Sequence, residues 1–216
     1  MATPPSWKRL LRKALVCIDA LSSRTTVPAW SFGGGTAMML TYRHRLSQDI
    51  DIFFPDPQVL GYLTPRLNDD IQEITDCTAY DEQHASLKLI LDIGEIDFIA
   101  GLPLTQTPFE RWQFEGRTIQ RETPVEIVAK KVVYRGHEFR VRDVFDLACL
   151  LERDPVAVGK EQAVFVKKRD LLLPQLRRMR NTFKSQIKEL VKVSSGYETL
   201  RDNALERVIQ FYENSP

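Results

Sequence analysis

The sequence predicts an α+β protein in which a mixed sheet flanked by helices precedes an all-helical C-terminal part. Short segments with the two-residue alternation typical of β-strands are confined to the region before residue 122. A helix-initiation signal follows at Thr123, and helical periodicity then continues along the chain. We therefore expect two domains, residues 1–122 with the sheet and residues 123–216 with helices alone.

The first elements alternate between helix and strand. Apolar residues at helical spacing predict a helix over residues 7–22. The segment AWSFGG then predicts a short strand that ends at glycine, and GTAMMLTYR predicts a helix. The segment QDIDIFF predicts a strand that Pro55 stops. This order of elements places a glycine turn between a strand and a helix.

The middle of the chain predicts a helical stretch and three more strands. VLGYLTPRLNDDIQEI predicts one helix, or two helices broken near Pro65. A strand is expected near Cys77, followed by strands over residues 87–91 and 95–100 that a tight turn at residues 92–94 connects. After these strands, RTIQR predicts one more.

The C-terminal part begins at a capping signal. Thr123 and Glu126 form a capping-box pattern, with Pro124 at the first helical position. VRDVFDLACLLER is amphipathic at helical spacing. Further helices are expected over residues 161–181, 183–193 and 198–213, with interruptions at Pro174 and at residues 194–196.

Composition limits the class of protein. With 43% hydrophobic and 27% charged residues, the chain can bury a sizeable core. Its hydrophobic runs are too short to span a bilayer, and its N-terminus has no clean signal-cleavage pattern, so a cytoplasmic protein without a membrane partner is expected. Cys17, Cys77 and Cys149 are scattered and predict buried thiols rather than disulfides or a zinc site.

Charge is distributed unevenly along the chain. Residues 49–110 contain thirteen acidic and two basic residues, whereas residues 160–192 contain ten basic and three acidic residues. The basic segment is either an ordinary solvated helical surface or a surface that meets a polyanion such as RNA. In the second interpretation, acids of the first segment hold metal ions.

Two features of the N-terminal part suggest a catalytic site. Glycines at the start of a helix allow a phosphate to approach backbone amides, although the same turn can be a plain strand-to-helix connection. Asp49 and Asp51 lie on one face of a predicted strand, where they either face solvent or share a divalent cation. Asp97, flanked by Ile96 and Phe98 on a separate strand, supplies a third acid. Three such acids predict a two-metal phosphoryl-transfer site with Mg²⁺.

These residues resemble a known superfamily. Gly34 and Gly35, followed after thirteen residues by Asp49 and Asp51, are similar to the signature of the polymerase-β-like nucleotidyltransferases, whose third acid lies on a later strand. GGTAMMLTYRHRLSQDIDIFF together with EIVAKKVVYRGHEFRVRDVFDLACL resembles the AbiEii/AbiGii abortive-infection nucleotidyltransferase toxins. The resemblance covers roughly residues 30–152 and implies a nucleotidyltransferase-type sheet.

The resemblance also implies roles for individual residues. It assigns the triphosphate to the glycine turn, Mg²⁺ to the three acids, and a charge-neutralising role to Lys131, with Lys130 as the alternative. Asp143 would join the catalytic group. Either Asp143 or Asp146 would point at the nucleotide or at the lysine. Alternatively, the segment RDVFD only anchors its helix to the domain by an ion pair. The implied nucleotide-binding residues are Gly34, Gly35, Thr36, Arg45, Ser47, Lys131, Arg142 and Asp146, and the implied metal ligands are Asp49, Asp51 and Asp97.

Some residues depart from the pattern of this family. Gly33 adds a third glycine, which could shift the register of the phosphate turn by one residue. His44, His84 and His137 have no spacing typical of a metal site, and we interpret each as a surface residue or an indirect contributor.

Several functions are compatible with these observations. The first is a Mg²⁺-dependent enzyme that transfers NMP from an NTP to an acceptor hydroxyl, on tRNA or another RNA, as the toxin of a toxin–antitoxin pair with a cognate antitoxin protein. The alternatives are a non-catalytic module that binds a nucleotide or partner, and a nucleotidyltransferase for small molecules. The intact set of three acids favours an enzyme, and the basic segment favours RNA.

Overall fold

The computed structural model describes residues 5–215, which divide into two compact units. The sheet unit comprises residues 5–38, 47–103 and 109–122. The helical unit comprises residues 39–46, 104–108 and 123–215. The chain passes from the first unit to the second for the last time between Glu122 and Thr123, but two earlier segments already belong to the helical unit.

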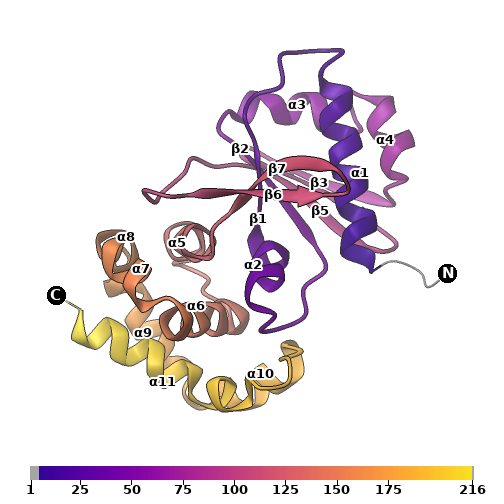
Figure 1. The fold of residues 1–216 in the computed structure, drawn as a ribbon. Helices are drawn as coiled ribbons and strands as arrows, with labels where there is room; N and C mark the ends of the chain where they lie inside the picture. The colour runs from indigo at the N-terminus through magenta and orange to yellow at the C-terminus, as the bar shows by residue number, and fades with distance from the viewer. Residues whose placement is uncertain (1–4, 216) are drawn as a thin grey trace. The chain divides into compact units, whose positions relative to one another are not determined.

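A seven-stranded mixed sheet forms the centre of the sheet unit, which confirms the expected α+β class (Figure 1). The strand order is β3-β4-β5-β2-β1-β7-β6. Strand β1 pairs parallel to β7, and β2 pairs parallel to β5, while the other neighbours are antiparallel. The strands are β1 (Ser31–Gly33), β2 (Ile50–Phe54), β3 (Ala79–Gln83), β4 (Ser86–Leu91), β5 (Gly94–Ala100), β6 (Phe109–Phe114) and β7 (Arg117–Glu122).

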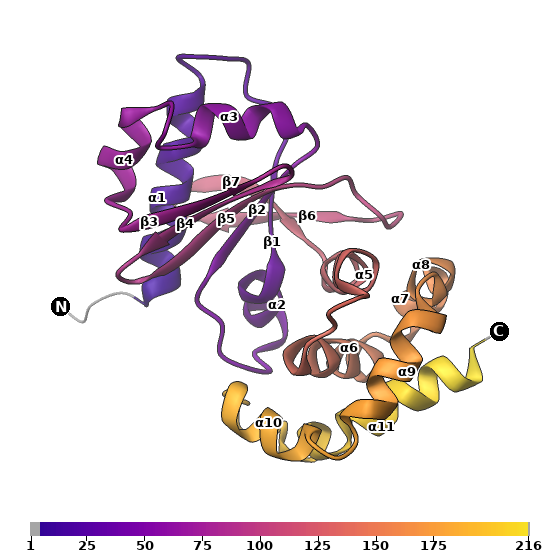
Figure 2. The same ribbon diagram turned by 180° about the vertical axis from the view of Figure 1, so that it is seen from behind.

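One face of this sheet is apolar and covered by helices. In β2, Ile50, Ile52 and Phe54 are buried, and the alternate positions of β4 and β5 are buried in the same way. Helix α1 packs against β2 and β5, and α3 packs against β4 and β5 (Figure 2). The opposite face of β2 carries Asp51. The helices of this unit are α1 (Ser6–Leu21), the 3₁₀ turn η1 (Pro57–Val59), α3 (Leu60–Leu63) and α4 (Asp69–Thr75).

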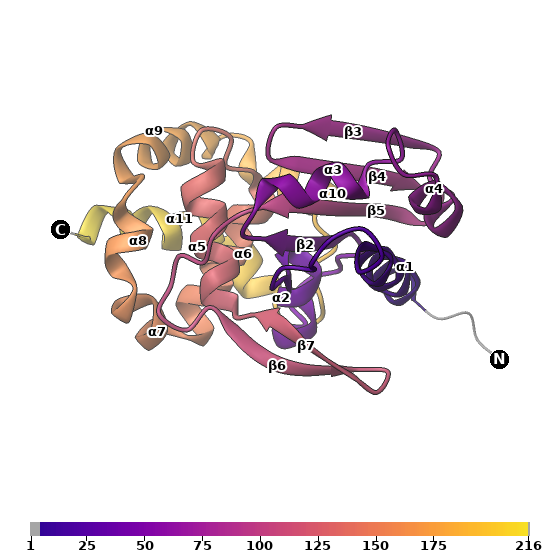
Figure 3. The ribbon, with the colours of Figure 1, turned by 90° about the horizontal axis from the view of Figure 1, so that it is seen from above.

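The helical unit is built around helix α6. Its residues from Phe145 to Leu150 are all buried, and α5, α7, α10 and α11 all contact it. Helix α2 (Gly34–Tyr42) begins in the sheet unit and ends in the helical unit. The remaining helices are α5 (Pro124–Arg135), α6 (Val141–Arg153), α7 (Pro155–Lys160), α8 (Gln162–Val166), α9 (Arg169–Met179), α10 (Phe183–Leu190) and α11 (Glu198–Asn214); Figure 3 shows them from above.

Several local expectations were wrong. Strand β6 was not predicted, whereas the strand expected near Cys77 is present as β3, which begins at Ala79. The helix expected over residues 161–181 is split into α8 and α9, and Pro174 lies inside α9 rather than interrupting it.

No helix within residues 5–215 is long and apolar enough to cross a bilayer.

The capping box at Thr123 is only half formed. The Thr123 side chain accepts a hydrogen bond from the Glu126 amide at 3.4 Å. The Glu126 carboxylate is directed elsewhere and accepts from the amides of Leu104 and Thr105 and from the Thr105 hydroxyl. A buried acid in the first turn of α5 therefore fixes the segment 104–108 to the helical unit.

Candidate active site

The glycine turn and Asp51 lie directly against each other. Gly34 has a φ of 68°, in the left-handed region, and a Cβ atom there would overlap the Asp51 carboxylate. A Cβ atom on Gly33 would overlap the carboxylate of Glu122. Both positions therefore require glycine, and the third glycine of the sequence is explained by the close approach of a second acid.

The turn is also tied to the strand that follows it. Thr36 is buried in α2, and its hydroxyl donates a hydrogen bond to the Asp49 carbonyl oxygen at 2.6 Å. The hydroxyl of Thr36, a predicted triphosphate ligand, thus already donates to a backbone carbonyl oxygen. Ser47, predicted to line the nucleotide pocket, lies half-buried in the segment between α2 and β2.

Charged residues form a row across the polar face of the sheet. Register pairs Gly33 with Asp51, Asp51 with Asp97, Asp97 with Lys88, and Lys88 with Asp81. Paired residues of neighbouring strands place their side chains on the same face of the sheet. The structure therefore brings Asp51 and Asp97 together, as the sequence analysis expected.

Asp49 lies just outside this row. It precedes the first residue of β2, and its Oδ1 accepts a hydrogen bond from the Glu95 amide at 3.2 Å. Asp49 is close enough to Asp97 to raise the pKa of that residue.

Lys88 supplies the positive charge of the row. Its Nζ forms an ion pair with Glu95 and lies 3.4 Å from Asp97 Oδ2. Burial raises the pKa of Asp97, the Lys88 ammonium opposes this effect, and the Glu95 and Asp49 carboxylates add to it. Burial lowers the pKa of Lys88, but the hydrogen bond to Glu95 and the charges of Asp97 and Glu95 outweigh it and raise the pKa overall.

Lys88 was not singled out in the sequence, although its position could have been derived. The hairpin between β4 and β5 pairs Leu91 with Gly94 across a two-residue turn. Counting outward from this turn places Lys88 opposite Asp97.

The donor set fits a hard divalent cation. The three predicted ligands offer only carboxylate oxygens, the ligands that Mg²⁺ prefers. As the side chains are placed, no three acidic, histidine or cysteine residues within residues 5–215 converge closely enough to enclose a metal ion. Lys88 instead offsets part of the negative charge.

A second charged cluster is buried in the helical unit. Asp146 is fully buried, and Arg45 contacts both of its oxygens, with Nε–Oδ1 at 2.6 Å and Nη2–Oδ2 at 2.8 Å. His44 Nε2 lies 2.8 Å from Asp146 Oδ1, and Lys131 Nζ forms an ion pair with Oδ2. The structure thus brings together Arg45, Lys131 and Asp146, which lie far apart in the sequence.

Asp143 extends this cluster on the same face of α6. Its Oδ1 lies 3.1 Å from Lys131 Nζ and 3.4 Å from Arg135 Nη1, and its Oδ2 accepts from the Arg140 amide at 3.1 Å. Lys131 is only 7% exposed and its ammonium lies against both carboxylates. Arg142, also expected at the nucleotide, is half-buried, and its side chain forms no hydrogen bond or ion pair with another residue of 5–215.

Electrostatics keep both acids ionised. Burial raises the pKa of Asp146, but Arg45 and Lys131 outweigh it and hold the pKa well below its usual range. Burial likewise raises the pKa of Asp143, and Lys131 and Arg135 outweigh it so that the pKa is lowered. A buried cluster of this kind is costly to break, because removal of one partner leaves a charge unpaired.

His44, which was interpreted as a surface residue or an indirect contributor, is fully buried and contacts Asp146. Burial lowers its pKa against the opposing effect of Asp146, so the ring is neutral and its Nε2–H donates to Asp146. Its Nδ1 has no partner among residues 5–215, and its ring stacks on Phe145 with centroids 5.7 Å apart. No spacing in the sequence indicated this role.

A match to a protein family identifies the class of protein. The family described as nucleotidyl transferase AbiEii toxin, type IV toxin–antitoxin system, matches residues 18–194. The chain belongs to this family and is a nucleotidyltransferase.

Solved structures show more distant likeness. JHP933 from Helicobacter pylori is 14% identical, with a TM-score of 0.49 over 98% of this chain and 93% of the other. The antibiotic-resistance factor ANT(2'')-Ia is 18% identical, with a TM-score of 0.42 over 85% and 94% of the two chains. A nucleotidyltransferase-like antigen from Paracoccidioides brasiliensis is 17% identical, with a TM-score of 0.44 over 82% and 91%. No curated protein shows a significant sequence match.

Proposed function

We propose that this toxin-family nucleotidyltransferase transfers NMP from an NTP to a hydroxyl of an acceptor RNA, such as tRNA, in a Mg²⁺-dependent reaction. The observation that carries the proposal is the pairing of Asp51 with Asp97 beside the Gly34 turn. Two carboxylates on one face, next to backbone that only glycine permits, are suited to a triphosphate and its counterions.

Asp49, Asp51 and Asp97 would hold the metal, which when bound neutralises charge on the triphosphate and lowers the pKa of the attacking hydroxyl. The acceptor oxygen bonds to the α-phosphorus as the bond to the bridging oxygen breaks, and pyrophosphate leaves. Asp97, whose pKa is raised by burial, would take the proton of the hydroxyl. Gly34 and Gly35 let the phosphates approach the backbone.

In this proposal the Lys131 ammonium forms ion pairs with the carboxylates of Asp143 and Asp146. A direct contact between Lys131 and the triphosphate stays a prediction, and the nucleotide would have to compete with two carboxylates for the ammonium. Asp146 holds the guanidinium of Arg45, which lies in the segment between α2 and β2.

RNA as the acceptor is supported by exposed cations of the helical unit. Two arginines of the basic segment are neutralised by α11, because Arg177 pairs with Glu213 at 2.7 Å and Arg180 with Glu206 at 2.9 Å. Within the basic segment 160–192, the exposed cations that form no ion pair with another residue of 5–215 are Lys160, Lys167, Arg178, Lys184, Lys188 and Lys192. The membership of a toxin–antitoxin family implies a cognate antitoxin as a further partner.

The proposal is tested by incubating the protein with labelled NTPs, Mg²⁺ and total RNA. Asp51→Asn should reduce transfer by roughly 100-fold or more, because it removes a metal ligand. Asp81→Asn is the matched control, since Asp81 lies in the same row but on the exposed edge strand β3. Equal transfer by the parent and Asp51→Asn would refute the mechanism. Binding of NTP without transfer would favour the non-catalytic module, and label on small molecules alone would refute RNA.

A further inference from the structure

A pocket of about 460 Å³ lies in the helical unit, where the end of α2 meets the segment after α10. Leu46 N donates to the Lys192 carbonyl oxygen at 2.8 Å, Ser194 N donates to the His44 carbonyl oxygen at 2.9 Å, and Arg45 forms an antiparallel bridge with Val193. This pairing holds two segments about 150 residues apart in the sequence side by side. The volume lies within the roughly 300–1,000 Å³ of ligand pockets.

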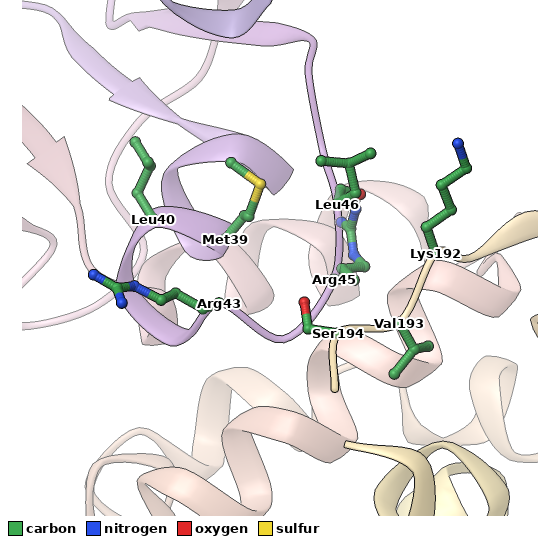
Figure 4. A pocket seen from close by; sticks show the side chains of 8 residues that line it. All are labelled: Met39, Leu40, Arg43, Arg45, Leu46, Lys192, Val193 and Ser194. Carbon is green, nitrogen blue, oxygen red and sulfur yellow. Dashed lines mark hydrogen bonds between the residues drawn. The ribbon is translucent and has the colours of Figure 1, made fainter. Parts of the chain in front are cut away.

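The lining combines apolar groups with two cations. Met39, Leu46 and Ser194 lie between Arg43, which extends from one end, and Lys192, which extends from the other (Figure 4). Leu46 is 47% exposed and offers apolar surface at the pocket. Among residues 5–215, no acid forms an ion pair with Arg43 or Lys192. Arg45, which also lines the pocket, is committed to Asp146 and anchors its wall.

The backbone of Arg43 is strained. Its φ is 54°, and its amide donates to the Met39 carbonyl oxygen at 2.8 Å, so it occupies the left-handed position after a helix that glycine usually fills. A side chain at this position is retained against a conformational preference. The Arg43 side chain lies at one end of the pocket.

We propose that this pocket binds one nucleotide of a single-stranded RNA, with its base against Met39 and Leu46 and its two flanking phosphates on Arg43 and Lys192. A cation at each end fits a chain that carries a phosphate on both sides of each base, whereas a free mononucleotide offers a phosphate on one side. The pocket lies at the C-terminal end of α2. The use of this pocket as an acceptor subsite rests on the proposed transfer to RNA. The binding of RNA in the pocket does not depend on that proposal.

The test is fluorescence anisotropy with a short labelled single-stranded RNA and, in competition, AMP, without NTP or metal. Arg43→Gly should weaken RNA binding about tenfold and reduce the log–log salt slope by about 0.7, because one phosphate contact is lost. Arg43→Gly also relieves the strained backbone, so its thermal stability should equal or exceed that of the parent and loss of fold cannot explain the result. Lys192→Gln should behave similarly.

Two further variants separate the pocket from general charge. Leu46→Ser should weaken binding about fivefold at an unchanged salt slope, since apolar contact is lost. Arg111→Gln removes an exposed cation from the sheet unit and should leave binding unchanged.

Equal losses in Arg43→Gly and Arg111→Gln, or full RNA affinity in all three pocket variants, would overturn the inference, and so would AMP binding as tightly as RNA. Full affinity in the pocket variants together with loss of antitoxin neutralisation would assign the pocket to a protein partner instead. Transfer lost in Asp51→Asn with RNA binding intact would leave both proposals standing. RNA binding through the pocket in a parent that transfers nothing would refute only the proposed function.

Discussion

Replacing Lys131 with methionine should destabilise the helical unit by about 3 kcal/mol. Methionine keeps the apolar stem of the side chain but removes the ammonium that lies between the buried carboxylates of Asp143 and Asp146. Loss of one partner of a buried ion pair costs about 3–5 kcal/mol. The lower value applies because Asp146 keeps Arg45, and Asp143 keeps Arg135 and the Arg140 amide. For a chain of this size, the melting temperature should fall by roughly 6–12 °C.

The positions of the tryptophans allow the two units to be followed separately. Trp7, Trp30 and Trp112 all lie in the sheet unit, so tryptophan fluorescence reports on that unit. Far-ultraviolet circular dichroism is dominated by helices, most of which lie in the helical unit. Lys131→Met should therefore shift the urea midpoint measured by circular dichroism. Lys188→Met, at an exposed position of α10, is the control and should leave it unchanged.

A double-mutant cycle isolates the ion pair. Asp143→Asn removes the charge but keeps an oxygen that can accept from the Arg140 amide. The double variant should recover about 1–2 kcal/mol relative to the sum of the single changes. The reasoning would be refuted if Lys131→Met unfolded at the midpoint of Lys188→Met while its affinity for NTP fell. In that case the ammonium would serve the nucleotide rather than the carboxylates.

Three further predictions follow from individual contacts. Gly34→Ala should abolish transfer and lower the free energy of unfolding by about 1–3 kcal/mol, because the left-handed φ and the Asp51 carboxylate leave no room for a methyl group; normal activity would contradict this. The folded-state pKa of His44 is lowered, so the unfolded chain binds the proton at a higher pH than the folded chain does. The free energy of unfolding should therefore fall as the pH drops below about 6.5. In urea titrations at several pH values, the free energy of unfolding of His44→Gln should depend less on pH in this range. Glu126→Ala should cost about 2–3 kcal/mol by chemical denaturation, since the Leu104 and Thr105 amides lose their acceptor, whereas Glu138→Ala at an exposed position should cost little.

The sheet face with Asp51 and Asp97 could be predicted because strand periodicity is local. Once β2 and β5 are recognised, period-two alternation fixes which side chains share a face with the acids. The three cysteines Cys17, Cys77 and Cys149 are buried and free, as their odd number and scattered spacing predicted. Strand β6 was missed because its sequence, FERWQF, alternates too weakly between exposed and buried positions.

The cluster around Asp146 could not be predicted from periodicity. The helical repeat indicated that Asp143 and Asp146 share a face, but it could not show whether that face meets a nucleotide or a lysine. The answer depends on His44 and Arg45, which lie about a hundred residues earlier in the sequence. The basic segment was likewise overestimated as a free surface, since the acids of α11 that neutralise Arg177 and Arg180 follow it in the chain.

The sequence separation of Arg45 and Asp146 has a consequence for synthesis on the ribosome. The two residues are 101 positions apart, and at about 5–20 residues per second the translation of that interval takes roughly 5–20 s. During this time the guanidinium of Arg45 and the ring of His44 are exposed without the carboxylate that later buries them. A fragment that starts at residue 123 would carry Asp146 without Arg45 and His44. The helical unit therefore cannot be produced by simple truncation, and its nascent form completes folding only after α6 has left the exit tunnel.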